Sequence, residues 1–347
     1  MTFLIWTLVA LAATAVIWKG SGLLENAAAR LSAHYGLPEI VQGAVVVAVG
    51  SSFPELSTTV ISTLLHGEFE LGVAAIVGSA LFNILVIPAL AGLSSREQLR
   101  ANRDLVYKEA QFYMIAVAVL TLTFAFAVIY HPVADDGPAI RGEMTRWLAL
   151  MPVMLYALYL FVQYQDTIDH VATPETGDVR PAREWGRLAL SLLLIIVGVE
   201  ALVRTAIRFG DLFGTPSFLW GITVVAAGTS VPDAFVSIRA AREGRGVTSI
   251  ANVLGSNTFD LLVCIPAGVL IAGATVVNFS IAAPLLGVLT LATVVLFLMM
   301  RTRMILERWE AVLLLVLYLV FVLWIGLETF GTVDLIPTLP PAPTDGQ

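Results

Sequence analysis

The amino-acid sequence predicts an all-α polytopic membrane protein with about ten transmembrane helices, arranged as two inverted five-helix repeats. Three observations lead to this prediction: the composition, the series of apolar stretches and a duplicated motif. Of the 347 residues, 58% are hydrophobic and only 13% are charged, whereas soluble domains carry about 25% charged residues. The chain is therefore expected to lie in a membrane. Its net charge of −7 gives no reason to expect a nucleic-acid partner.

The apolar stretches give the second observation, because each has roughly the 20 residues that a helix needs to cross a bilayer. Short polar loops separate them, and the tail is rich in proline, which is typical of disorder. The expected spans are 2–18, 38–65, 70–93, 109–130, 147–163, 186–207, 216–238, 247–272, 277–300 and 309–327.

These spans divide into two halves. We expect a first five-helix repeat at 1–164 (ion motif 48–83), a short cytoplasmic linker at 165–185, a second, inverted repeat at 186–330 (ion motif 226–260) and a disordered tail at 331–347. Most of the 19 Lys and Arg residues, Lys19 included, fall in loops after odd-numbered spans. The excess of positive charge in cytoplasmic loops then predicts that both termini face outward.

The duplicated motif is the third observation. Residues 49–56 read VGSSFPEL and residues 227–234 read AGTSVPDA, so glycine, serine, proline and an acid recur in the same order. A partner motif follows each copy in the same register, as IVGSALFN (76–83) and VLGSNTFD (253–260). Self-similarity of this kind indicates an internal duplication. An odd number of spans in each copy makes the two copies face opposite ways, as in transporters built from inverted repeats.

Each copy of the first motif places a proline next to a carboxylate inside an apolar span. The proline leaves a carbonyl in the preceding turn without its amide donor, and a carboxylate in hydrocarbon usually marks a functional site. Carbonyl, hydroxyl and carboxylate oxygens are hard ligands that suit Ca²⁺ and Na⁺. One such acid could be structural and paired to a neighbouring helix, but the duplication of acid, proline and hydroxyls argues against that alternative.

The partner motifs add polar side chains on one helix face each. Ser79 and Asn83, like Ser256 and Asp260, are four residues apart, which places each pair on the same face. Two inverted copies would therefore surround one central pocket with carboxylate and amide groups, those of Glu55, Asp233, Asn83 and Asp260.

Other residues of the two repeats are expected to be structural. Gly78 and Gly255 would allow close approach of neighbouring helices. Glu200 has no acidic counterpart in the first repeat and is expected to be a packing or interfacial residue. Cys264 is the only cysteine, so no intrachain disulfide can form, and it is expected to be a small core residue.

The motif pair GSSFPEL and GTSVPDA, with VGSALFN and GSNTFD, resembles the alpha repeats of the calcium/cation antiporter superfamily, the sodium/calcium exchangers. The resemblance covers 36–92 and 214–271, and its wording is most like the potassium-dependent branch. It implies two inverted five-helix halves and a secondary active antiporter that exchanges Na⁺ for Ca²⁺ by alternating access. Coupling to K⁺ is left open.

The resemblance also implies the ligands. The calcium site would be formed by Ser51, Glu55, Thr229 and Asp233. The sodium or central positions would be formed by the carbonyls of Ala48 and Ala226 and by Ser52, Ser79, Asn83, Ser230, Ser256 and Asp260.

The expected partners are the lipid bilayer and the transported Ca²⁺ and Na⁺, with K⁺ or H⁺ left open. No enzymatic activity, no cofactor and no obligatory protein partner are expected. The short linker lacks a large cytoplasmic region, which points to a prokaryotic-type exchanger in the plasma (inner) membrane. The alternative is a calcium/proton exchanger, although that relative usually carries Gly-Asn-x-x-Glu in place of Ser-x-Pro-acid. A channel or a membrane scaffold is a further alternative, against which the inverted buried acids argue.

Overall fold

A computed structural model describes residues 1–35, 48–95, 98–103, 105–134, 139–167, 180–333 and 335–336. The helices of the first half are α1 (Thr2–His34), α2 (Ala48–Ser51), α3 (Phe53–His66), α4 (Phe69–Leu85), α5 (Ile87–Ser94), α6 (Ala110–Tyr130) and α7 (Arg146–Thr167). Those of the second half are α8 (Pro181–Phe213), α9 (Ser217–Trp220), α10 (Ala226–Arg242), α11 (Gly246–Phe259), α12 (Ile265–Ala272), α13 (Phe279–Arg301) and α14 (Arg308–Thr329). Three π-helical segments continue into these helices, η2 (Leu105–Glu109), η3 (Gly221–Val225) and η4 (Asp260–Cys264).

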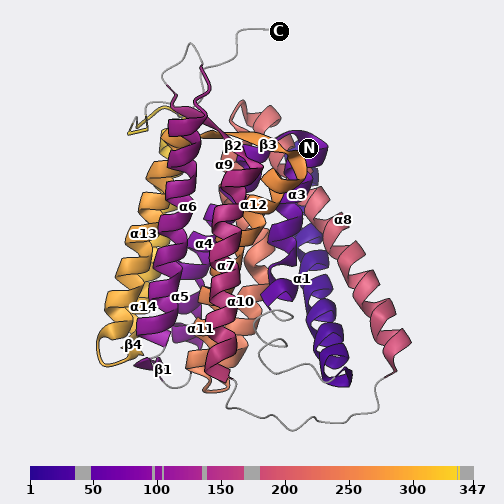
Figure 1. Cartoon of the computed structure of the whole chain (residues 1–347), viewed down its shortest axis with the longest axis vertical. Coiled ribbons are helices and arrows are strands. Elements are labelled where there is room, and N and C mark those ends of the chain that lie inside the picture. Colours follow the sequence, from indigo (N-terminus) through magenta and orange to yellow (C-terminus); the bar gives the residue numbers. More distant parts are fainter. Residues whose placement is uncertain are drawn as a thin grey trace.

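The helices form one upright bundle (Figure 1). Within the described residues, nine helices are long and apolar enough to cross a membrane. Helix α3 supplies the second part of the remaining predicted span, 38–65, whose residues up to 47 lie outside the described residues. The predicted all-α polytopic fold of about ten spans is confirmed.

Helices α1 and α8 are longer than the predicted spans 2–18 and 186–207. Each has 33 residues and so a length of about 50 Å, well beyond the roughly 30 Å of hydrocarbon in a bilayer. Lys19, which the prediction placed in a loop, therefore lies inside α1. The prediction ended the span where polar residues begin, but α8 packs along this part of α1 and no proline interrupts it. Figure 1 shows the two helices side by side, slanting away from the rest of the bundle at their lower ends.

The contact between α1 and α8 is the same contact made twice. A Cβ added to Gly198 would lie 2.7 Å from Ile17 Cγ1, and a Cβ added to Gly20 would lie 2.8 Å from Ile195 Cγ1. Each isoleucine thus fills the space that a glycine on the other helix leaves. Ile17 and Gly20 occupy the places in the first repeat that Ile195 and Gly198 occupy in the second. The duplication therefore includes the first helix of each repeat.

The centre of the bundle is formed by α4 with α5 and by α11 with η4 and α12. In the most apolar 18-residue stretch of each of these two spans, 83% and 72% of the residues are buried, against 17% in the corresponding stretch of α7. Gly78 confirms the expected close approach, because a Cβ there would lie 2.3 Å from the Ile222 carbonyl oxygen. The same expectation for Gly255 stays a prediction. The residue that occupies the place of Ile222 in the first repeat is Ala44, which lies outside the described residues, and none of the described atoms lies within 4 Å of a Cβ added at Gly255.

Two short antiparallel ribbons join the halves, and the sequence analysis did not predict them. Strand β1 (Leu99–Arg100) pairs with β4 (Ile305–Leu306), and β2 (Arg141–Thr145) pairs with β3 (Ala274–Asn278). Each ribbon takes one strand from each repeat, and the ribbons lie at opposite ends of the bundle (Figure 1). The second ribbon is extended by the Phe279 amide, which donates to the Ile140 carbonyl at 2.8 Å.

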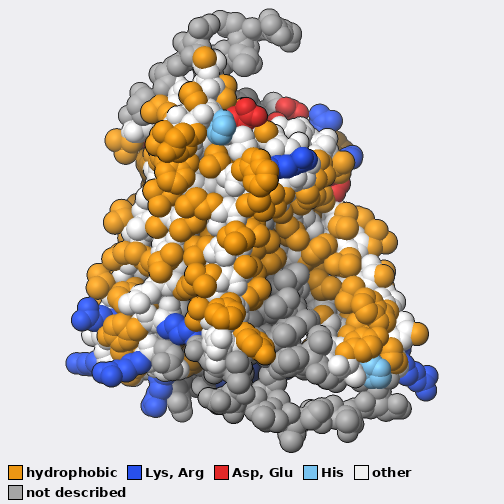
Figure 2. Space-filling view, in the orientation of Figure 1, with side chains coloured by type: hydrophobic (Ala, Val, Ile, Leu, Met, Phe, Trp, Pro, Cys, Tyr) orange, Lys and Arg blue, Asp and Glu red, His pale blue; other side chains and the backbone are white. Residues whose placement is uncertain are grey.

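The two ends of the bundle differ in charge. Helix α1 begins and α14 ends at the same end, the upper one in Figure 1. Figure 2 shows Lys and Arg side chains gathered at the opposite, lower end and several acids near the top. Most of the predicted linker, 168–179, lies outside the described residues, as do 337–347 of the predicted disordered tail. The start of that tail contacts α14, because the amides of Leu335 and Ile336 donate to Glu328 Oε1 at 2.7 and 2.5 Å.

Candidate cation-binding site

The two partner motifs lie near the middle of membrane-length helices. Asn83 falls in the span Phe69–Ser94 and Asp260 in the span Gly246–Ala272. The predicted ligands whose side chains are described are all buried, with 0–2% of their surface exposed: Ser51, Ser52, Glu55, Ser79, Asn83, Ala226, Thr229, Ser230, Asp233, Ser256 and Asp260. Carboxylates at this depth need compensating partners.

The first motif breaks its helix. Helix α2 ends at Ser51 and α3 begins at Phe53, with Pro54 in its first turn. The proline is tolerated there because a first-turn amide has no partner inside the helix. The break places Glu55 in the first turn of α3. Ala48 is the first described residue of α2, so its carbonyl lies on the helical turn just before the break.

The second motif keeps its helix continuous, which differs from the first. Pro232 lies inside α10, and the irregularity comes earlier, in the π-helical segment that ends at Val225. The Ala226 carbonyl, one of the predicted ligands, accepts hydrogen bonds from Ser230 Oγ at 2.8 Å and from Thr229 Oγ1 at 3.3 Å. Within the described residues the two copies of the motif thus differ in local geometry, with a helix break in the first and a continuous helix in the second.

Hydroxyl pairs join the two repeats across the pocket. Ser51 Oγ lies 3.3 Å from Ser256 Oγ, and Ser79 Oγ lies 2.7 Å from Ser230 Oγ. Ser79 also donates to Glu55 Oε1 at 3.4 Å. The structure therefore brings the two copies of the first motif and the two copies of the partner motif into one cluster, as the sequence predicts.

The acids face hydroxyls of the opposite repeat. The Thr229 side chain approaches the Glu55 carboxylate, and the Ser51 side chain approaches the Asp233 carboxylate. These two contacts are the same contact in the two repeats, because Ser51 and Thr229 occupy equivalent positions. Asp260 is approached by the Ser52 side chain and by Cys264, whose Sγ lies 3.7 Å from Asp260 Oδ1.

One oxygen of each acid is buried and has no hydrogen-bond partner among the described residues: Glu55 Oε2, Asp233 Oδ1 and Asp260 Oδ2. The same is true of Asn83 Oδ1. A buried acceptor without a partner costs about 1–3 kcal/mol, and more when it is charged. A cation of hard character satisfies such oxygens together. Within the described part of the chain no three acidic, histidine or cysteine side chains surround one point, so the ligand set has to include hydroxyl, amide or carbonyl oxygens.

The sequence analysis missed Asn257. Its side chain is fully buried and contacts Asn83, the Ala80 carbonyl and Tyr113. The signal that could have found it lies in the partner motifs, where the second copy has asparagine and the first has alanine. A polar residue that stands in one copy only, inside an apolar span, indicates a contact that the other copy does not make.

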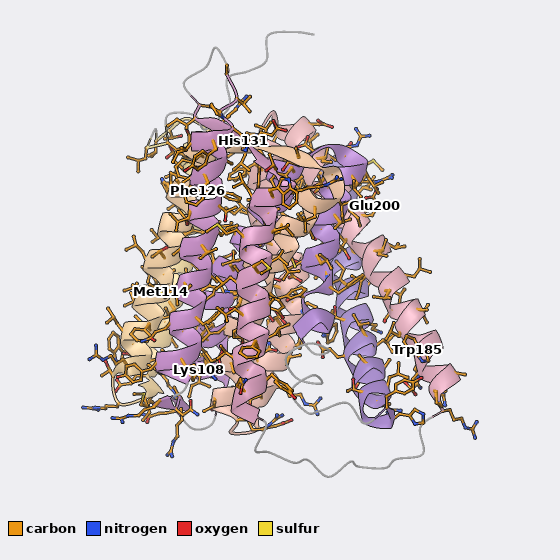
Figure 3. The ribbon with its side chains drawn as sticks, in the orientation of Figure 1. Lys108, Met114, Phe126, His131, Trp185 and Glu200 are labelled. Atoms are coloured by element: carbon orange, nitrogen blue, oxygen red, sulfur yellow. The ribbon has the colours of Figure 1, made fainter. Side chains whose placement is uncertain are left out.

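Two residues expected to be structural have specific neighbours. Cys264 is buried as expected, but it lies beside Asp260. Glu200, near the upper end of α8 (Figure 3), accepts a hydrogen bond from Arg204, and its Oε2 lies 3.0 Å from His66 Nε2 on α3. This partly exposed cluster joins α8 to α3 and is separate from the ion motifs.

Comparison with known families decides the class of this protein. The sequence profile described as sodium/calcium exchanger protein matches residues 5–165 and 184–327. The chain belongs to the sodium/calcium exchanger family. It is therefore a multi-pass membrane antiporter of calcium and other cations.

Individual relatives agree with this assignment. The sodium/calcium exchanger MaX1 of Methanosarcina acetivorans is 25% identical over 87% of this chain and 93% of its own length. The sodium/potassium/calcium exchanger 4 of mouse is 40% identical, but over only 36% of this chain and 18% of its own length. Among solved structures, the sodium-calcium exchanger NCX_Mj has the same fold, with a TM-score of 0.58 at 21% identity over 92% of this chain and 97% of that one.

Proposed function

We propose that this member of the family exchanges Na⁺ for Ca²⁺ by alternating access. The observation that supports it most directly is the set of buried oxygens without hydrogen-bond partners on Glu55, Asp233 and Asn83, gathered from both repeats. Two carboxylates balance the charge of one Ca²⁺, and hydroxyl and carbonyl oxygens complete an irregular cage of the kind that Ca²⁺ accepts.

The assignment of ligands follows this geometry. Calcium is bound by the two acids and the hydroxyls that face them from the opposite repeat, which are Glu55 with Thr229 and Asp233 with Ser51. Sodium, with a single charge, is bound by sets with more neutral oxygens, namely the carbonyls of Ala48 and Ala226 and the hydroxyls of Ser52, Ser79, Ser230 and Ser256. The Ser79–Ser230 contact at 2.7 Å supports this second set, because it joins one hydroxyl from each repeat.

Asp260 adds a third carboxylate and with it the question of a second coupling ion. A third negative charge leaves room for one monovalent cation beside Ca²⁺, with Asn83 on the other side of the central position. We propose that this ion is K⁺, and the local likeness to the mouse sodium/potassium/calcium exchanger 4 supports it. The alternative is H⁺, carried by Asp260 itself, which would make the protein a calcium/proton exchanger.

The proposed location is the plasma membrane of a prokaryotic cell, with both termini outside. The lower end of the bundle in Figure 2, where Lys and Arg gather, would then face the cytoplasm. Helix α1 begins, and helix α14 ends, at the opposite, upper end of the bundle. Accessibility labelling of a cysteine placed at residue 2 in intact cells tests this orientation, in a Cys264→Ala background.

The decisive experiment is ⁴⁵Ca²⁺ uptake into proteoliposomes with imposed ion gradients. An outward Na⁺ gradient should drive Ca²⁺ inward against its own gradient, and added K⁺ should increase the rate. Uptake driven by a pH gradient without Na⁺ would favour the calcium/proton exchanger instead. Calcium movement only down its own gradient would identify a channel and refute exchange.

A further inference from the structure

Both N–H groups of the Asn257 side-chain amide donate hydrogen bonds. Its Nδ2 donates to the Ala80 carbonyl at 3.1 Å and to the Tyr113 hydroxyl at 3.2 Å. Its Oδ1 accepts from Asn83 Nδ2 at 2.9 Å. A primary amide has two N–H donors, and both are engaged here.

The direction of this chain of hydrogen bonds is fixed at both ends. The Ala80 carbonyl can only accept, so Nδ2 of Asn257 has to face it, and Oδ1 has to face Asn83. At the far end, Asn83 Nδ2 also donates to Asp233 Oδ2 at 3.4 Å, and an ionised carboxylate can only accept. Turning either amide over would place donor against donor or acceptor against acceptor in a buried site. The orientation of both amides therefore follows from the network.

We infer that Asn257 is a positioning residue that holds the Asn83 carbonyl oxygen toward the transported cation. With its Nδ2 held by Asn257 and Asp233, Asn83 is left with Oδ1 buried and without a partner among the described residues. An amide turned the other way would present an NH₂ group, which repels a cation. The inference rests on the proposed function, because it assumes that Asn83, which contacts the calcium ligand Asp233, contributes its Oδ1 to the bound Ca²⁺ as well as lining the central position.

Tyr113 extends the network away from the site. Its oxygen accepts from Asn257, which leaves its own proton for another acceptor. The Thr293 side chain lies beside it and donates its own proton to the Leu289 carbonyl at 2.8 Å, so the Thr293 oxygen is available to accept. The orientation of Asn83 on α4 is thus supported from α11, α6 and α13.

The residues at the equivalent positions explain why only one repeat has such a network. The equivalent of Asn83 in the second repeat is Asp260, and the equivalent of Asn257 in the first is Ala80. An amide has two different ends and its orientation has to be set, whereas an ionised carboxylate presents oxygen both ways. Asp260 needs no such partner, and alanine at residue 80 suffices.

The test is a double-mutant cycle read by Ca²⁺ titration calorimetry on the purified full-length protein. Asn257→Ala should weaken Ca²⁺ affinity by about tenfold, the cost of losing an oriented buried ligand. In an Asn83→Ala background the same substitution should change affinity by less than about twofold, because no amide at residue 83 is left to orient. Tyr113→Phe keeps the Ala80 anchor and should show a smaller loss, about threefold, which Asn83→Ala also removes.

Thr258→Val is the matched control, because Thr258 is buried next to Asn257 but donates only to Leu254 of its own helix. It should bind Ca²⁺ like the wild type. Equal losses from Asn257→Ala in both backgrounds would show a merely structural residue and overturn the inference. If Asn257→Ala does not fold, the Tyr113→Phe pair decides by the same criterion. A wild-type protein that binds no Ca²⁺ would overturn the proposed function, and this inference with it.

Discussion

The α1–α8 contact and the cation site show opposite relations between the two repeats. At the contact, both copies have the same residues in the same roles, isoleucine against glycine in each direction. At the cation site the copies differ: the position of Asn83 in the first repeat is taken by Asp260 in the second, and that of Ala80 by Asn257. A helix crossing needs only complementary shape, which two identical copies supply. A site that holds different ions needs a defined number of charges, and identical copies restrict that number to even values.

The largest effect is expected where the repeats agree in chemistry. Glu55→Gln or Asp233→Asn should abolish Ca²⁺ transport, because an amide leaves the ion undercompensated in a low-dielectric site. The measurement is ⁴⁵Ca²⁺ uptake by proteoliposomes. Glu200→Gln is the matched control, since Glu200 is paired with Arg204 and His66 away from the ion motifs, and it should retain most of the activity. Wild-type exchange by Glu55→Gln would remove this acid from the site.

A second prediction tests the close helix approach at Gly78. Gly78→Ala should prevent folding or lower the unfolding temperature sharply, because the added Cβ meets the Ile222 backbone oxygen, which cannot move alone. Gly326→Ala on α14 is the control, since none of the described atoms lies within 4 Å of its added Cβ, and it should be neutral, or stabilising by up to about 1 kcal/mol through helix propensity. Thermal unfolding in detergent compares them. Similar effects of the two substitutions would contradict the close approach at Gly78.

A third prediction tests the symmetry of the α1–α8 contact. Gly20→Ala and Gly198→Ala should each destabilise by about 1–3 kcal/mol, because each overfills the space of an isoleucine. The two effects should match within about 0.5 kcal/mol. Ile195→Ala should recover part of the loss in Gly20→Ala. Gly22→Ala is the control on the same helix, since a Cβ there meets nothing within 4 Å, and a loss there would point to helix α1 itself.

The smallest effect on calcium is expected from the residue that makes the repeats unequal. Asp260→Asn should retain Ca²⁺ binding better than Asp233→Asn. The reason is that Asp233, approached by Ser51, belongs to the proposed calcium site, whereas Asp260, beside Ser52 and Cys264, belongs to the central position. Stimulation by K⁺ should vanish in Asp260→Asn, since the extra charge is gone. Exchange is measured with and without K⁺ across pH. Identical profiles for wild type and Asp260→Asn would show that Asp260 is a bystander.

The sequence predicts the class of fold well because its signals are local and repeated. Apolar stretches set the spans, and the Ser-x-Pro-acid motifs locate Glu55 and Asp233 in both copies. The length of α1 was not predicted, because burial of its polar part depends on α8. The strands were not predicted either, since Leu99 and Leu306 pair only after both halves are in place.

The sequence predicts which side chains lie together in the cluster, but not how they are connected. The motif pairs place Ser79 and Ser230 in one pocket, and the structure joins them at 2.7 Å. Asn257 was missed because its importance lies in which acceptor it faces, the Ala80 carbonyl, and a motif does not specify orientation. The π-helical segment that begins at Asp260 was missed for a similar reason, because no residue type by itself signals a π-helical turn.

The two ribbons set limits on how the bundle can deform. Among the described residues, every strand is next along the chain to one of the helices α5, α6, α7, α12, α13 and α14, and no strand is next to α1 or α8. Swinging one whole half against the other would break backbone hydrogen bonds at one end, where a ladder can shift only by whole registers. Helices α1 and α8 are held to the rest by side chains such as the His66–Glu200 pair, which can exchange partners. The ribbons therefore resist relative movement of the helices that adjoin them, whereas no backbone ladder among the described residues holds α1 and α8.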